Sequence, residues 1–277
     1  MIRGYCLSWR IMINIKYFCS LVFSILICYN GSSQLYEWKK EVDLPILLSG
    51  AGLNTYVIIK EPRIPTPTLE EVEIWSRDEV PAWDRSATYN WDPTAGSWSD
   101  HFQHASIAFP LILAASGEAR KEYKIVSLMF FETMFFTQGV IGGFKLTVRR
   151  RRPYVFNEEA PDGIKYSRQV FYSFISGHTT SIASACFFAA NVFQDYHPDS
   201  KYRWLVWAGA ATLPAVTGFL RYQAGRHFIS DVVAGYGIGA VIGSMVPYLH
   251  RRNKDSDLSV NVIGIPGGGL LSLNYSF

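Results

Sequence analysis

His227 and Asp231 are the residues whose types and spacing most directly suggest chemistry. They are four positions apart, about one helical turn, so the carboxylate can hold one imidazole nitrogen and leave the other free to attack. Such support is typical of a histidine that acts as a nucleophile or a base. Arg221 and Arg226 lie beside them and offer planar donor forks that suit phosphate oxygens. The alternative interpretation is a helix cap at Ser230 or Asp231 within a solvated basic loop.

A second cluster runs from Lys145 to Pro153 and supplies positive charge. Together with Arg221, Lys145 and Arg152 can neutralise phosphoryl oxygens as charge redistributes in a transition state. Taken alone, Lys145 reads equally well as a lysine that extends its ammonium out of a helix end. For Arg149 to Arg151, a basic patch at the membrane surface is the preferred interpretation.

A third cluster is Ser176-Gly177-His178. Ser176 is expected to cap a helix that begins near Gly177, where unpaired N–H groups and the positive dipole end favour an anion. Gly177 permits close backbone approach, and His178 can protonate a leaving oxygen while His227 attacks phosphorus. The alternative is an ordinary capped helix start. The three clusters together predict phosphoryl transfer.

Five apolar runs must position these clusters, and several approach the ~20 residues needed to span a bilayer. The runs are Ala105 to Gly117, Ile125 to Phe144, Thr179 to Phe193, Trp204 to Leu220 and Val232 to Leu249. If consecutive runs form antiparallel helices, all three clusters lie at one side of the bundle. Frequent small residues within the runs favour close helix packing. Glu132, well inside a span, requires a polar partner there.

Composition supports a membrane protein. Of the 277 residues, 49% are hydrophobic and only 18% are charged, which is apolar for a soluble protein. The net charge of +3 is too mild to indicate a nucleic-acid partner. Three of the four cysteines lie in the first 28 residues, which excludes a disulfide framework in the body of the chain. No Cys/His or carboxylate cluster has metal-ligand spacing, so catalysis without a metal or cofactor is expected.

The chain is expected to divide into four parts. Residues 1–33 resemble a signal peptide cleaved before Gln34, or an uncleaved anchor. Residues 34–104 form an extramembrane or interfacial region. Within that region, Leu44 to Ile59 either crosses the membrane or forms a surface-lying or re-entrant helix. The scattered tryptophans belong either to an interface belt or to a packed cap. Residues 105–250 form the helical bundle, and residues 251–277 form a tail that is either a hairpin or disordered.

The motifs resemble those of the type 2 phosphatidic acid phosphatase family, whose fold is shared with vanadium-dependent haloperoxidases. That family's pattern is Lys, six residues, Arg-Pro; then Pro-Ser-Gly-His; then Ser-Arg, five residues, His, three residues, Asp. Lys145 with Arg152-Pro153 matches the first motif fully. Ile175 replaces the proline of the second and Leu220 the serine of the third. These departures are expected to affect fine geometry and substrate choice more than the reaction. The resemblance covers roughly Ala105 to Leu249.

The resemblance implies an all-α bundle of about five to six mostly membrane-spanning helices, with a polar Trp-rich N-terminal loop region. It implies that His227 is a nucleophile forming a phospho-histidine, that Asp231 orients it, and that His178 is the general acid and later the base. The implied phosphate-binding residues are Lys145, Arg152, Ser176, Gly177 and Arg221. No cofactor is implied. Membrane members act on lipid phosphates or diphosphates such as phosphatidic acid, phosphatidylglycerol phosphate, undecaprenyl diphosphate or lipid A.

Three functions are therefore compared. The first is a membrane phosphatase of lipid phosphates. The second is a vanadate-dependent haloperoxidase, and the third is a non-catalytic protein that binds anionic headgroups. A bacterial inner membrane is expected, with the site facing the periplasm if Leu44 to Ile59 does not cross and facing inward if it does. The sequence gives no oligomeric state.

Overall fold

The fold was obtained as a computed structural model, which describes residues 35–106, 108, 113, 116–252, 258–265 and 268–275. The segment expected to be a signal peptide or anchor lies outside the described residues. So does most of the apolar run from Ala105 to Gly117. Its flanks belong to α5 (Pro93–Ser106) and α7 (Gly117–Lys121), so helix begins well before that run, inside the region expected to be a polar loop.

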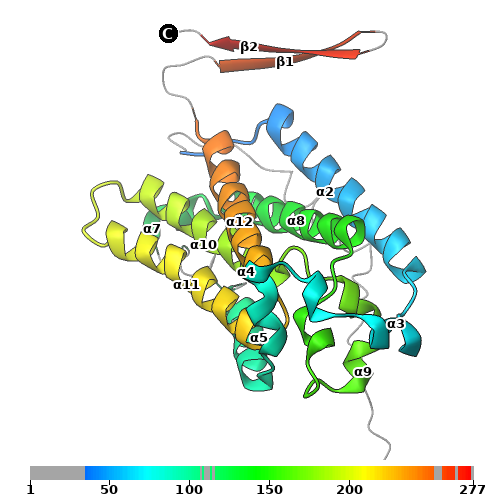
Figure 1. The fold of residues 1–277 in the computed structure, drawn as a ribbon. Helices are drawn as coiled ribbons and strands as arrows, with labels where there is room; N and C mark the ends of the chain where they lie inside the picture. Colours follow the sequence, from blue (N-terminus) through cyan, green and yellow to red (C-terminus); the bar gives the residue numbers. More distant parts are fainter. Residues whose placement is uncertain are drawn as a thin grey trace, which may run out of the picture. The chain divides into compact units, whose positions relative to one another are not determined.

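The described body is all-α, as predicted, and its long helices follow the apolar runs (Figure 1). These are α2 (Lys40–Lys60), α8 (Tyr123–Val148), α10 (Gly177–Tyr196), α11 (Arg203–Gln223) and α12 (Ile229–His250). Short helices α3 (Leu69–Ile74), α4 (Ala82–Arg85) and α9 (Asp162–Lys165) lie in the connections, with 3-10 turns at Glu61–Arg63, Arg77–Glu79, Ser86–Tyr89, Pro153–Phe156 and Arg168–Phe171. The tail contains an antiparallel hairpin of β1 (Leu258–Ile265) and β2 (Gly268–Tyr275).

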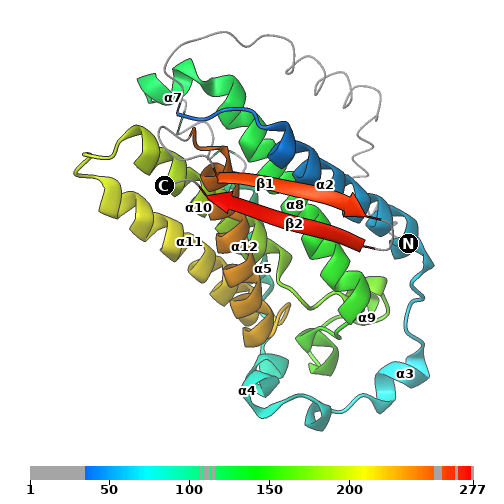
Figure 2. The same ribbon diagram turned by 90° about the horizontal axis from the view of Figure 1, so that it is seen from above.

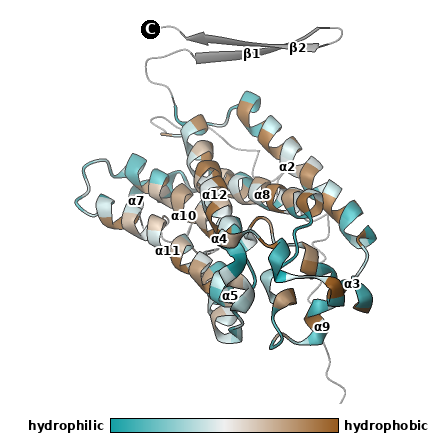
Figure 3. Cartoon of the chain, viewed as in Figure 1, coloured by the Kyte–Doolittle hydropathy of each residue, from teal (hydrophilic) through white to brown (hydrophobic). Residues whose placement is uncertain are grey.

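Three helical segments of the described chain are long and apolar enough to cross a membrane: Lys40–Arg63, Tyr123–Phe156 and Ile229–His250. The long helices carry mostly hydrophobic residues, whereas hydrophilic ones gather in the connections (Figure 3). The run from Leu44 to Ile59 is thus part of one continuous helix, despite Pro45 and its glycines. α10 has a similar length but is enclosed by its neighbours, so it needs less lipid-facing apolar surface.

α10 is the central helix. It packs most extensively on α12 and α11 and also contacts α8 and α5, while α2 lies along α8 (Figure 2). The contact with α12 depends on small residues one turn apart. A Cβ on Gly239 would lie 2.3 Å from the carbonyl oxygen of Thr180, and one on Gly243 would lie 2.3 Å from that of Ser184. These two backbones therefore approach more closely than any larger side chain would allow, as the small-residue pattern predicts.

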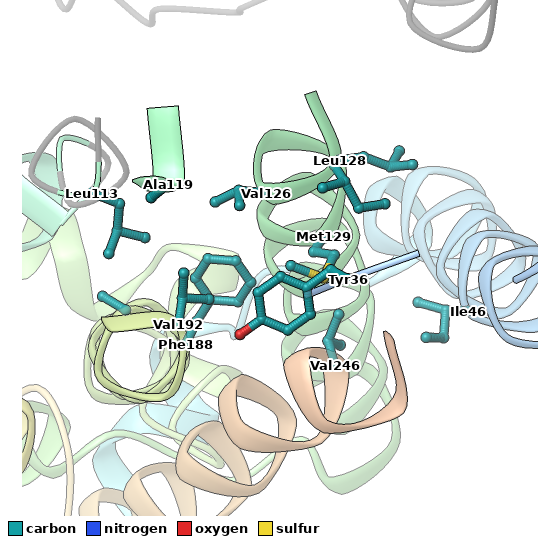
Figure 4. Close-up of a cluster of buried hydrophobic side chains, with 12 residues drawn as sticks. Tyr36, Ile46, Leu113, Ala119, Val126, Leu128, Met129, Phe188, Val192 and Val246 are labelled. Atoms are coloured by element: carbon teal, nitrogen blue, oxygen red, sulfur yellow. The ribbon is translucent and has the colours of Figure 1, made fainter. Parts of the chain in front are cut away.

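An apolar cluster closes one end of the bundle (Figure 4). Met129 of α8, Phe188 of α10 and Val246 of α12 meet Tyr36, and all four are completely buried. At the other end, Trp75 packs against Phe171. Trp91 packs against Tyr154, whereas Trp83 and Trp98 are 72% and 59% exposed. Two of these four tryptophans thus belong to a packed cap, and two remain on the surface.

Candidate active site

A tight turn between α11 and α12 presents His227. Gly225 has a φ of +64°, and a Cβ there would lie 2.2 Å from the carbonyl oxygen of Asn90. Its own carbonyl accepts a hydrogen bond of 2.9 Å from the backbone N–H of Tyr154. Only glycine meets both demands without strain. The turn is therefore anchored by two segments remote in sequence.

His227 is 1% exposed, and its Nδ1 lies 2.7 Å from the carbonyl oxygen of Ser173. A carbonyl only accepts hydrogen bonds, so Nδ1 carries the proton and Nε2 keeps the lone pair needed for attack. The nearest carboxylate oxygen of Asp231 is 3.7 Å from Nδ1. Nδ1 of His227 therefore donates its hydrogen bond to the backbone carbonyl of Ser173 and not, as expected, to the carboxylate of Asp231.

Asp231 positions His227 indirectly, through Ser173. Its Oδ2 accepts hydrogen bonds from the hydroxyl of Ser173 at 2.5 Å and from the backbone N–H of Phe228 at 2.9 Å. The first fixes the residue whose carbonyl holds His227, and the second closes the first turn of α12. Its Oδ1 accepts a 2.6 Å hydrogen bond from Nη1 of Arg150. Ser173 therefore connects Asp231 to His227, and none of the sequence motifs includes Ser173.

The basic run at Arg149 to Arg151 is not a simple membrane-surface patch, contrary to the preferred interpretation of the sequence. The guanidinium of Arg150 also bonds Asp84 at 2.7 Å and stacks 4.1 Å over the ring of Phe228. Asp84 is 1% exposed and accepts a 3.0 Å hydrogen bond from the backbone N–H of Ser230. Arg150 thus joins two buried carboxylates.

Lys145, Arg152 and Arg221 surround the same space with positive charge. The ammonium of Lys145 lies 3.2 Å from the position of a Cβ on Gly177, so the start of α10 and Lys145 are in close contact. Arg152 and Arg221 are each 6% exposed, and neither Nε has a hydrogen-bond partner in the described chain. Lys145 and Arg152 also line a cavity of about 360 Å³ beside α2 and α8. Buried donors without partners suit an anionic ligand.

Ser176 occupies the position that precedes α10, as predicted, but its hydroxyl lies 2.9 Å from the hydroxyl of Thr179 rather than capping a backbone N–H. Its own N–H donates a 3.1 Å hydrogen bond to the carbonyl of Asp231. Arg226 stacks beside aromatic rings, and its charge acts on Arg152 and Arg221. Its guanidinium lies 5.6 Å from the ring of Trp91 and 5.4 Å from that of Tyr154.

His178 faces Asp100, a residue of α5 that the sequence motifs do not mark. Its Nε2 lies 2.7 Å from Oδ1 of Asp100, and Nη1 of Arg221 lies 3.4 Å from the same oxygen. Burial lowers the pKa of His178 to about 4, although the hydrogen bond to Asp100 opposes this by raising it. The same hydrogen bond holds the pKa of Asp100 below its usual range.

The three sequence clusters lie together. Burial places the pKa of His227 well below its usual range, and the charges of Arg152, Arg221, Lys145 and His178 lower it further. All four groups are thus close enough to act electrostatically on His227. A neutral imidazole amid cations can attack an anionic group near neutral pH without first losing a proton.

Asp100→Asn is expected to move the alkaline limb of the kcat/KM profile to lower pH, on the order of one pH unit. The free-enzyme profile reports the group that must be protonated. Asp100 raises the pKa of His178, so its removal lowers that pKa. Asp92→Asn is the matched control, since Asp92 only caps α5 through Thr94 and Ala95. An unmoved limb in Asp100→Asn would show that His178 is not the group titrating there.

The sequence is similar to that of a known protein family over the segment that contains these motifs. Residues 126–255 match the family model of the PAP2 superfamily. The chain is 29% identical over 157 residues to the lipid A 4'-phosphatase of Porphyromonas gingivalis, which covers 54% of this chain and 61% of the relative. The chain therefore spans about three fifths of the length of that curated relative.

Among solved structures, a transmembrane PAP2-type phosphatidylglycerolphosphate phosphatase from Bacillus subtilis matches with 20% identity and a TM-score of 0.43. The match covers 73% of this chain and 95% of that one. The family match includes every residue from Lys145 to Asp231 discussed above. The segment that carries the three motifs belongs to the PAP2 superfamily, and the resemblance predicted from the sequence is confirmed.

Proposed function

We propose that this protein is a membrane phosphatase that hydrolyses lipid phosphate or diphosphate monoesters through a phospho-histidine. One observation carries the proposal. The bare Nε2 of His227 is buried within the electrostatic reach of Lys145, Arg152 and Arg221. An imidazole nitrogen with a free lone pair, close to three cations, suits attack on the phosphorus of an anionic phosphoryl group.

The reaction proceeds in two displacements. In the first, Nε2 of His227 bonds to phosphorus, the bond to the leaving oxygen breaks, and His178 donates a proton to that oxygen. In the second, His178 takes a proton from water, whose oxygen attacks phosphorus, and the P–N bond breaks. Inorganic phosphate leaves and His227 is regenerated. Lys145, Arg152 and Arg221 offset the charge on the three equatorial oxygens, so no step requires a metal ion.

The substrate is proposed to be a membrane lipid that bears a terminal phosphate. The site lies at the ends of apolar helices, and the Porphyromonas gingivalis relative is named for the 4'-phosphate of lipid A. The test is phosphate release by purified protein from lipid A, phosphatidic acid, phosphatidylglycerol phosphate, undecaprenyl diphosphate and a soluble phosphate ester. Release from at least one lipid, faster than from the soluble ester, is expected. No release from any lipid would refute the proposal.

We also propose an inner-membrane location with the site facing the periplasm. The end of the bundle away from the site carries basic residues, as a cytoplasmic face does. These are Arg120, Lys121, Lys124, Lys201, Arg203, Arg251 and Arg252. The site end is equally basic, but part of that charge binds the phosphate, so the count alone does not decide the orientation.

The C-terminal end of α2 lies at the site, because Glu61, which follows its last residue, lines the same cavity as Lys145. The N-terminal end of α2 therefore lies at the opposite end of the bundle. With Gln34 exported, as predicted from the sequence, the site faces the periplasm only if α2 does not cross, and it faces inward if α2 crosses.

Cysteine labelling tests this orientation. Trp83 is 72% exposed and belongs to α4. The neighbouring Asp84 bonds Arg150, which places α4 at the site end of the bundle. In spheroplasts, Trp83→Cys should react with a membrane-impermeant maleimide, and Lys201→Cys should react only after lysis. The reverse pattern would place the site in the cytoplasm.

A further inference from the structure

A second group of ionisable side chains is buried where α2, α8 and α12 meet. Asp43, Glu132 and His250 are each 0% exposed. Nε2 of His250 lies 3.1 Å from Oδ1 of Asp43 and 3.3 Å from Oε2 of Glu132. One ligand atom from each residue lies within 4.8 Å of the others. His250 and Asp43 meet the need of Glu132 for polar partners, but the sequence gives no hint that three residues gather.

This group is separate from the phosphate site. Thirteen residues of α8 separate Glu132 from Lys145, which is about 20 Å at a rise of about 1.5 Å per residue. Nineteen residues of α12 separate His250 from Asp231, which is about 28 Å on the same basis. The reaction proposed above does not use this group.

The hydrogen bonds around the group turn its remaining atoms inward, where Nε2 of His250 lies within hydrogen-bond distance, 3.1 Å, of Oδ1 of Asp43. Nδ1 of His250 lies 2.8 Å from the carbonyl oxygen of Val246, so Nδ1 carries a proton and Nε2 faces the carboxylates. The backbone N–H of Lys39 donates a 2.6 Å hydrogen bond to Oδ2 of Asp43, which leaves Oδ1 turned inward. Neither oxygen of Glu132 has a hydrogen-bond partner in the described chain.

Charge balance calls for a cation among these atoms, either a doubly protonated His250 or a bound metal ion. With His250 neutral, two carboxylates place two negative charges in a fully buried site between apolar helices. Uncompensated burial of one such charge costs several kcal/mol. A divalent cation bound to both carboxylates and to a neutral imidazole makes the group neutral.

We propose that Asp43, Glu132 and His250 form a structural site for a divalent transition-metal ion, with zinc the best match. The ligands would be Oδ1 of Asp43, Oε2 of Glu132 and Nε2 of His250, one atom from each residue. Tetrahedral zinc with bonds of about 2.0–2.2 Å separates its ligand atoms by about 3.4 Å. The two separations of 3.1 and 3.3 Å fit that geometry. A nitrogen-containing donor set favours zinc or manganese over calcium or magnesium.

The partners of the ligands support the same assignment. Histidine ligands usually donate their other N–H to a carbonyl or carboxylate, and carboxylate ligands are usually held by further hydrogen bonds. Val246 and Lys39 do this here. A metal at this position would tie three membrane helices together at the end opposite the phosphate site. The competing arrangement is a doubly protonated His250 that bridges the two carboxylates without any metal.

The test is the metal content of the full-length protein, purified in detergent without a metal-affinity column and measured by plasma mass spectrometry. We expect about one transition-metal ion per chain in the wild type and less than about a tenth of that in Glu132→Gln. Chelation should lower the thermal midpoint of the wild type, and added Zn²⁺ should restore it. Neither treatment should shift Glu132→Gln.

The matched control is Asp195→Asn, a carboxylate at the same end that binds Arg251 and Tyr36 instead. It should retain the metal. The proposal would be overturned if wild-type protein contained no metal and added Zn²⁺ did not raise its thermal midpoint. That result would favour the bridging imidazolium. That result needs no variant, so it stands even if Glu132→Gln fails to fold. It would leave the proposed phosphatase activity untouched.

Discussion

His227→Ala is expected to abolish phosphate release from the best lipid substrate, with kcat lower by on the order of 10⁴-fold or more. No other buried imidazole in the described site has both a nitrogen free for attack and a proton held elsewhere by a backbone carbonyl. Loss of the nucleophile removes the covalent step itself, whereas loss of one cation only weakens charge stabilisation.

His197→Ala is the matched control for this variant. His197 bonds Ser116 in the connection between α10 and α11, remote from the turn that carries His227. Its activity should stay within about twofold of wild type, as for a surface substitution away from the site. Both variants should keep the helical circular-dichroism spectrum. Substantial turnover by a folded His227→Ala protein would exclude His227 as the nucleophile.

Arg150→Ala is expected to lower the free energy of unfolding by about 3 kcal/mol or more. Its guanidinium is the cationic partner of both Asp84 and Asp231, which are 1% and 0% exposed. Removing it leaves two buried carboxylates without a cation. Because Asp231 also holds Ser173, and Ser173 holds His227, kcat should fall as well.

Arg151→Ala is the matched control, an arginine-to-alanine change at the neighbouring position. Arg151 pairs with the half-exposed Glu79 at 2.6 Å and stacks on Trp75. An exposed pair of this kind contributes about 1 kcal/mol or less. Denaturation of both variants in the same detergent gives the comparison. Equal losses of stability would contradict the assignment of Arg150 as the bridge between buried carboxylates.

The sequence predicts the helical body because apolar runs of near-spanning length leave few alternatives to helix in a membrane. It also predicts which clusters gather, since antiparallel helices bring Lys145, Ser176 and His227 to one side. The residues within each of the three motifs lie close together along the chain. Their spacing therefore shows in the sequence.

The partners of those residues are not predictable in this way. Asp100 meets His178 across 78 positions, and Asp84 meets Ser230 across 146. Ser173 acts through its backbone carbonyl, which every residue possesses. Asp43 and His250 are 207 positions apart. Such contacts depend on how helices and connections pack, and no periodicity or motif encodes them.

The central claim is that the phosphoryl group passes through a covalent bond to Nε2 of His227. It is tested most directly by mixing the purified enzyme with a ³²P-labelled lipid phosphate, quenching in alkali within one turnover, and sequencing the labelled peptide. A label that is stable in alkali, labile in acid and located on His227 is the predicted result. Label on another residue, or full turnover without labelled protein at any quench time, would contradict the account.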